Sequence, residues 1–119
     1  MLEKVWGVCY NMFMKEIEVY KTKSGKCPLN DWLDSIKDFS TRARIETRLN
    51  RLKYGNFGDY KYLSDGVSEL RLQFGSGYRI YYSEIDNIII LLLLGGDKSI
   101  QNKDITKAKE YLKIYKENK

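Results

Sequence analysis

The sequence predicts an α+β fold, in which two N-terminal helices and a C-terminal helix pack on a twisted antiparallel sheet of four to five strands. Apolar residues recur with helical spacing in two segments before residue 54 and in one segment after residue 100. The region between them alternates with the period of a strand and is interrupted by glycine-rich turns. The 119 residues fit one domain. We expect residues 14–119 to form this domain, with its helices gathered on one face of the sheet, and residues 1–13 to be an N-terminal extension.

The first part of the domain predicts one strand and two helices. Glu16–Thr22 alternates polar and apolar residues, which is typical of a half-buried strand. Pro28 favours the first turn of a helix. Helical spacing follows it in Leu29, Trp32, Leu33 and Ile36. A second helix is expected over Thr41–Lys53, and its core face consists of Ile45, Leu49 and Leu52. The two helices are expected to form an antiparallel hairpin.

The second part of the domain predicts a strand meander and a last helix. Val67–Phe74 and Tyr78–Ser83 alternate on either side of Gly75-Ser76-Gly77, a pattern that favours a tight hairpin. Ile88–Leu94 is apolar at every position, so we expect a central strand that is covered on both faces. Residues 101–115 return to helical spacing, with a core face of Ile105, Ala108, Leu112 and Tyr115.

Composition restricts both the partners and the chemistry. The formal net charge of +5 favours anionic partners such as nucleic acid, although compositional bias is an equally good reading of the charge alone. The chain has no histidine, which excludes histidine-based acid–base and nucleophile pairs. Any catalysis must therefore use acidic residues, lysine, arginine or tyrosine.

Cysteines and apolar runs bear on the compartment. Cys9 and Cys27 are far apart and form no ligand pattern, so we read them as free thiols in a reducing compartment, the cytoplasm. The longest apolar run, Ile88–Leu94, is far shorter than the roughly 20 residues that span a bilayer. We expect no metal, no cofactor and no membrane partner.

One face of the predicted hairpin collects the polar residues that could carry chemistry. Strand alternation places five residues on the face opposite Leu70 and Ile80, namely Glu69, Arg71, Gln73, Arg79 and Tyr81. Two arginines on one face can clamp a phosphate, and a tyrosine beside them can stack on a base or supply a hydroxyl. The alternative is a solvated face on which Glu69 forms an ion pair with one of the arginines.

Cleavage of RNA would need a base for the 2′-hydroxyl, cations for the phosphorane and an acid for the leaving oxygen. Glu69 or a lysine would serve as the base, and Arg71 with Arg79 as the electrostatic clamp. Lys98, at the end of the predicted central strand, or Tyr81 would serve as the acid.

A second basic group is expected to bind RNA. Arg44, Arg48 and Arg51 form a stripe on the second predicted helix. Lys61 and Lys103 complete the set of candidate RNA-binding residues. The alternative reading of these residues is a solvated helix surface. A partner protein could dock on the helix hairpin or the last helix.

Residues 55–109 resemble the RelE/ParE superfamily of toxins, in the HigB-like branch of phage-derived addiction-module killer proteins. The resemblance is carried by Glu69-Leu70-Arg71, Gly77-Tyr78-Arg79-Ile80 and Gly95-Gly96-Asp97-Lys98-Ser99, in this order and spacing. It implies two N-terminal helices on an antiparallel sheet, similar to small microbial ribonucleases. It also implies a cognate helix-turn-helix antitoxin, which neutralises the toxin and joins it on operator DNA.

The resemblance implies one of two activities. RelE- and HigB-type members cut mRNA on the ribosome without a metal, whereas ParE-type members poison DNA gyrase. Arg71 and Arg79 match the strand arginines of the superfamily. Phe74 stands where RelE-type toxins carry an arginine, and Lys103 where they carry a tyrosine. We expect a ribosome-dependent mRNA endoribonuclease; the alternatives are a gyrase inhibitor of the ParE kind and a degenerate binding domain.

Overall fold

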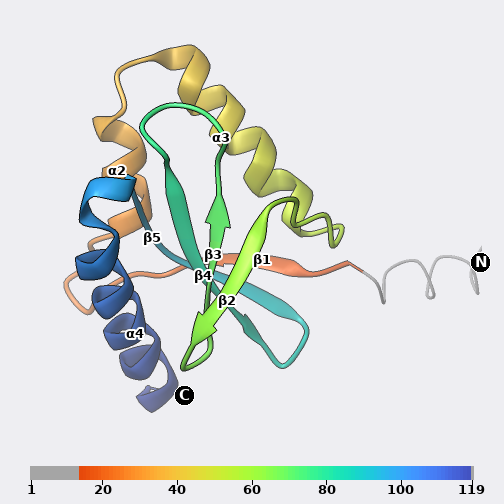
Figure 1. The fold of residues 1–119 in the computed structure, drawn as a ribbon. Helices are drawn as coiled ribbons and strands as arrows, with labels where there is room; N and C mark the ends of the chain where they lie inside the picture. The colour runs from red at the N-terminus through yellow and green to blue at the C-terminus, as the bar shows by residue number, and fades with distance from the viewer. Residues whose placement is uncertain (1–13, 119) are drawn as a thin grey trace, which may run out of the picture.

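The computed structural model describes residues 14–118, so the extension expected over residues 1–13 lies outside the described residues. The described chain forms a five-stranded sheet and three α-helices (Figure 1). In chain order, the elements are β1 (Glu16–Val19), α2 (Pro28–Ser35), α3 (Phe39–Leu52), β2 (Tyr60–Ser64), β3 (Val67–Arg71), β4 (Arg79–Ile85), β5 (Ile89–Gly96), a 3-10 turn (Lys98–Ile100) and α4 (Gln101–Glu117). The predicted α+β class is therefore confirmed.

The sheet is mixed, and the expectation of a purely antiparallel sheet was wrong. Its strand order is β1-β5-β4-β3-β2. Three neighbouring pairs are antiparallel, but β1 runs parallel to β5, with Glu16 opposite Ile89. A parallel neighbour needs a long crossover connection, and here the chain between the two strands contains α2, α3 and the whole meander.

The helices cover both faces of the sheet, so their expected gathering on one face was also wrong (Figure 1). Ile90 and Leu92 of β5 belong to the core that α2 and α3 cover. Leu91 and Leu93 belong to a second core beneath α4, together with Ala108 and Leu112. Because β5 is apolar on both faces, each face needs a helical layer to remove it from water.

Strand β2 forms one free edge of the sheet and was not predicted as a separate strand. It pairs with β3 so that Lys61 lies opposite Glu69. Its tyrosines Tyr60 and Tyr62 are 55% and 59% exposed. No helix within residues 14–118 is both long and apolar enough to cross a membrane.

Candidate functional site

The β3–β4 hairpin places the two predicted site arginines side by side. Arg71 lies directly opposite Arg79, and Glu69 lies opposite Tyr81. Residues that alternate along a strand share a face, so all four side chains project toward the α4 side of the sheet. Gly96 of β5 is the other neighbour of Arg79 and has no side chain there. The arginines thus form a pair on one face of the hairpin.

A single buried carboxylate holds this pair. The side chain of Glu69 is 2% exposed, against 35% for Arg71 and 15% for Arg79. Its Oε2 accepts a hydrogen bond from Nε of Arg71 at 2.8 Å, and its Oε1 lies 3.8 Å from Nε of Arg79. The amide of Gln101, at the start of α4, donates to Oε1 at 3.1 Å. The hydrogen bond that Arg71 donates to Glu69 raises the pKa of Arg71, which therefore stays charged.

This geometry makes Glu69 a positioning residue and does not support its predicted role as the base. Both of its oxygens face guanidinium or amide donors, and the side chain is out of reach of a substrate hydroxyl. An accessible carboxylate, which the sequence reasoning missed, lies nearby. Asp59 has a side chain 39% exposed, lies 4.0 Å from Nη1 of Arg71, and accepts a hydrogen bond from Gln73.

Tyr81 is buried, so its interpretation as an exposed stacking plate was wrong. Its side chain is 0% exposed and belongs to the core beneath α4. Burial raises the pKa of Tyr81 far above its ordinary value, and the negative charge of Glu69 adds to this effect. A buried phenol with a raised pKa is a poor proton donor for a leaving group on the surface.

Replacing Tyr81 by phenylalanine is therefore expected to change the activity of the protein less than about twofold. Among the described residues its hydroxyl is buried without a hydrogen-bond partner. Removing a buried, unsatisfied polar group is neutral or stabilising, so we expect an unchanged or higher melting temperature, measured by thermal unfolding. A large loss of activity in a folded Tyr81→Phe protein would instead support the predicted role of Tyr81 as the proton donor.

Asp104 lies at the start of α4 and is 6% exposed. Its Oδ2 approaches Gly96 closely, and within residues 14–118 it has no hydrogen-bond partner. Burial raises the pKa of this carboxyl above its ordinary value of 3.8, while Lys107 opposes the shift. A carboxyl with a raised pKa stabilises the fold when protonated, and this contribution is lost as the pH rises through the raised pKa.

Asp104→Asn is expected to increase the free energy of unfolding at pH 7 and to flatten its pH dependence above about pH 4. The amide keeps the shape of the side chain without the cost of a buried charge. Chemical denaturation of both proteins between pH 4 and pH 7 measures this difference. Equal free energies of unfolding for the two proteins across that pH range would show that burial of the charged carboxylate does not destabilise the fold.

The predicted lysines lie exposed around the arginine pair. Lys61 is the cross-strand neighbour of Glu69 on β2. Lys98 follows β5, and its side chain lies against Gly77 of the hairpin turn. Lys103 occupies the first turn of α4. Three accessible ammonium groups thus come from three different elements.

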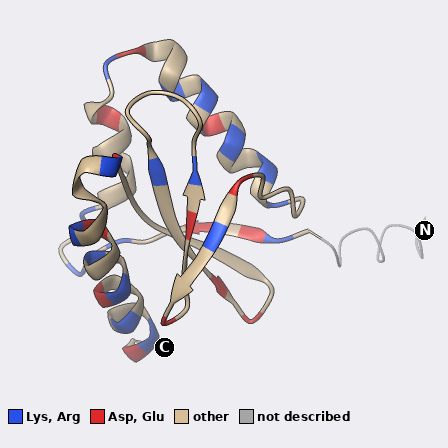
Figure 2. Cartoon of the chain, in the orientation of Figure 1, with Lys and Arg blue, Asp and Glu red and all other residues tan. Residues whose placement is uncertain are grey.

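The α3 arginines have different environments, although they form one row of basic residues along the helix (Figure 2). Arg48 donates to the backbone oxygens of Arg71 at 3.2 Å and of Phe57 at 3.0 Å, so it ties α3 to the end of β3. Arg44 lies over the ring of Phe74, with its guanidinium carbon 4.0 Å from the ring centroid. Arg51 is exposed near the end of the helix.

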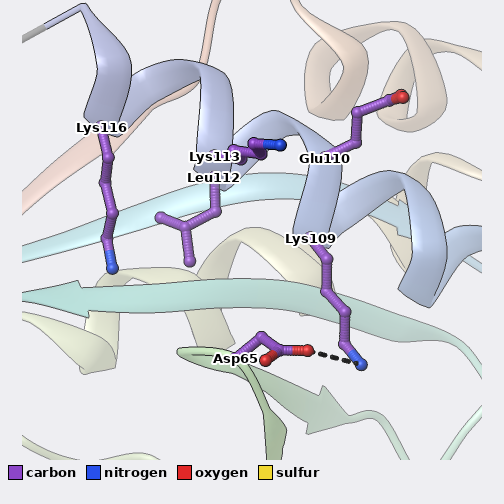
Figure 3. A pocket seen from close by; sticks show the side chains of 6 residues that line it. All are labelled: Asp65, Lys109, Glu110, Leu112, Lys113 and Lys116. Carbon is purple, nitrogen blue, oxygen red and sulfur yellow. Dashed lines mark ion pairs between the residues drawn. The ribbon is translucent and has the colours of Figure 1, made fainter.

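A separate cavity of about 490 Å³ lies between α4 and the β2–β3 turn (Figure 3). Its lining consists of Asp65, Lys109, Glu110, Leu112, Lys113 and Lys116. The ammonium of Lys109 is 3.3 Å from the carboxylate of Asp65, while the carboxylate of Glu110 points away from this pair (Figure 3). The cations of this cavity are lysines, which lack the planar fork of arginine, so it is a weaker anion site than the arginine pair.

The fold and this site describe a small basic α+β domain that presents a pair of arginines held by a buried glutamate. No family model matches the chain. The chain is 46% identical over 80 residues to an uncharacterised protein of Haemophilus influenzae, a match that covers 67% of this chain and 81% of that protein. The chain therefore belongs to the same family as the Haemophilus protein.

Proposed function

We propose that the protein is the toxin of a type II toxin–antitoxin module of the RelE/ParE superfamily, and that it inhibits translation as a ribosome-dependent mRNA endoribonuclease. One observation carries the proposal: Arg71 and Arg79 come from neighbouring strands and share one face, where a buried carboxylate is hydrogen-bonded to Arg71 and forms a longer ion pair of 3.8 Å with Arg79. A fixed guanidinium pair suits a phosphate, because its planar donors match the phosphate oxygens.

The proposed chemistry is attack of a 2′-oxygen on the adjacent phosphate. The new bond from the 2′-oxygen to phosphorus forms as the bond from phosphorus to the 5′-oxygen breaks, which leaves a cyclic phosphate and a free 5′-hydroxyl. Charge builds up on the phosphorane oxygens, where Arg71 and Arg79 stabilise it. Asp59, the accessible carboxylate beside Arg71, takes the 2′ proton. Lys98 gives a proton to the 5′-oxygen.

The proposed partners follow from the same assignment. A cognate helix-turn-helix antitoxin neutralises the toxin and carries it to operator DNA. The ribosome and its bound mRNA are the target, and the compartment is the cytoplasm. The net charge of +5 supports this target, since a basic domain associates faster with an anionic surface and more weakly as salt increases.

A second candidate is a toxin of the ParE kind, which inhibits DNA gyrase by binding and needs no proton transfer. The burial of Glu69 and Tyr81 favours it, because these two of the predicted proton-transfer groups are out of reach of a substrate. The paired arginines would then bind an acidic protein surface.

Inducible expression in bacteria, with pulse labelling of new protein, RNA and DNA, tests both candidates. The endoribonuclease assignment predicts that protein synthesis stops first, and that new 5′-hydroxyl ends appear within translated mRNA. An early stop in DNA synthesis with induction of the SOS response would instead support the gyrase inhibitor. Normal labelling of all three would contradict any toxin activity.

A further inference from the structure

A second positively charged pocket lies between α3 and the β3–β4 hairpin. Its volume is about 360 Å³. It is lined by Arg44, Thr47, Arg48, Arg51, Gln73 and Phe74, so three arginines meet two neutral polar groups and one aromatic ring. None of these lining residues is acidic. The lining therefore carries three positive charges, which the carboxylate of Asp59, hydrogen-bonded to Gln73, offsets only in part.

The arginines of this pocket differ from surface arginines that are already paired. Arg48 donates two hydrogen bonds to neutral backbone oxygens, which hold its guanidinium in place. Burial lowers the pKa of Arg48; the negative charge of Asp59 opposes this shift, and the positive charge of Arg51 adds to it. Like charges held close together favour an anion between them. The carboxylate of Asp59 accepts a hydrogen bond from Gln73 and lies 4.0 Å from Nη1 of Arg71, so it is shared between the pocket and the arginine pair.

The stack of Arg44 on Phe74 adds a second recognition element. Because the ring of Phe74 covers one side of the guanidinium, Arg44 is held flat over it. Its other side stays accessible, since Arg44 is exposed. A guanidinium plane of this kind can stack on an unpaired base, while its N–H edge binds a phosphate.

From this geometry, we propose that the α3–hairpin pocket binds the phosphodiester backbone of single-stranded RNA, at a site separate from the Arg71–Arg79 pair. The inference rests on the RNA target of the proposed function. The backbone oxygen of Arg71 accepts the hydrogen bond from Arg48, so the pocket adjoins the end of the strand that carries the arginine pair.

Fluorescence anisotropy with a labelled single-stranded RNA of about ten nucleotides tests the proposal without ribosomes. Arg44→Ala and Arg51→Ala are each expected to weaken binding about five- to tenfold. Each is also expected to reduce the slope of log affinity against log salt by about 0.7, the value for one lost phosphate contact on a single strand. Phe74→Leu, which removes the stack and keeps the charge, is expected to weaken binding two- to threefold.

Arg42→Ala is the matched control, because Arg42 lies on the same helix but forms an ion pair with Asp34 at 3.3 Å. It removes the same charge and is expected to leave binding within about twofold. If Arg42→Ala weakens RNA binding as much as the two pocket variants do, net charge alone explains the effect and the proposal is overturned. Unchanged RNA binding by both pocket variants would overturn it as well. If the protein is not a toxin but the pocket does bind RNA, the protein should still bind the labelled RNA and the pocket variants should still bind it more weakly.

Discussion

Replacing both Arg71 and Arg79 by alanine is expected to reduce mRNA cleavage on ribosomes by at least about 1,000-fold. In the proposed mechanism, each guanidinium stabilises charge that develops only in the transition state, and loss of one such donor typically costs about 100- to 1,000-fold in rate. The two losses are not expected to add fully, because the arginines act on one phosphate. The rate of appearance of cleaved mRNA in a purified translation system measures the effect.

Conservative and matched variants separate this effect from charge and from folding. Arg71→Lys and Arg79→Lys keep the charge but lose the planar fork, so each should retain more activity than the corresponding alanine variant. A double variant of Arg42 and Lys113, both outside the site, removes the same net charge and should cleave normally. Full cleavage by a folded double-alanine variant at Arg71 and Arg79 would remove the proposed active surface.

The second large effect is on stability: Glu69→Ala is expected to lower the free energy of unfolding by about 2–4 kcal/mol. Loss of one partner from a buried ion pair typically costs about 3–5 kcal/mol, because the remaining charge is left buried. We take a smaller value here, since the side chain of Arg71 is 35% exposed and water can solvate it. Urea denaturation at neutral pH measures the change.

Two further substitutions give this prediction its controls. Glu69→Gln keeps the shape and an acceptor oxygen, so it should lose less stability than the alanine variant. Glu84→Ala removes an exposed carboxylate that lies 3.7 Å from Lys15, and such surface pairs contribute about 0–1 kcal/mol. A loss below about 1 kcal/mol in Glu69→Ala would mean that the carboxylate does not hold the arginine pair.

Local patterns in the sequence were enough to locate most of the elements. Pro28 begins α2 as expected, and the glycine-rich turn joins β3 to β4. Strand alternation also placed Arg71 and Arg79 on one face, but the predicted tight turn was wrong, because residues 72–78 lie between the two strands and include Gln73 and Phe74. These features depend on neighbours in the chain, which a sequence displays directly.

The pairing of strands that are far apart in the chain could not be predicted from local sequence patterns. The parallel pairing of β1 with β5 joins segments more than 70 residues apart, and no local pattern specifies which edge a short strand joins. Strand β2 was not predicted because it lacks an alternation of apolar and polar residues. It is an edge strand in which Tyr60, Lys61 and Tyr62 are all exposed. The apolar character of β5 on both faces did signal a second helical layer.

The chemistry of the candidate site was the least predictable part. Alternation gives the face of Glu69 and Tyr81, but their burial depends on α4, which packs over that face. The approach of Asp59 to Arg71 and of Gln101 to Glu69 likewise joins residues from separate elements. Strand alternation therefore indicated the arginine pair, but it could not indicate that Glu69 and Tyr81, two of the candidate proton-transfer residues, are buried.

Nuclear magnetic resonance of the arginine side chains tests most directly whether Arg71 and Arg79 act together on a phosphate. The Nε–H signals of both arginines would be followed while a short RNA, protected from cleavage by 2′-O-methyl groups, is added. We predict that both signals shift together, with one dissociation constant, and that Glu69→Ala uncouples them. If neither signal moves while the same RNA saturates the protein, the pair is not a phosphate-binding site.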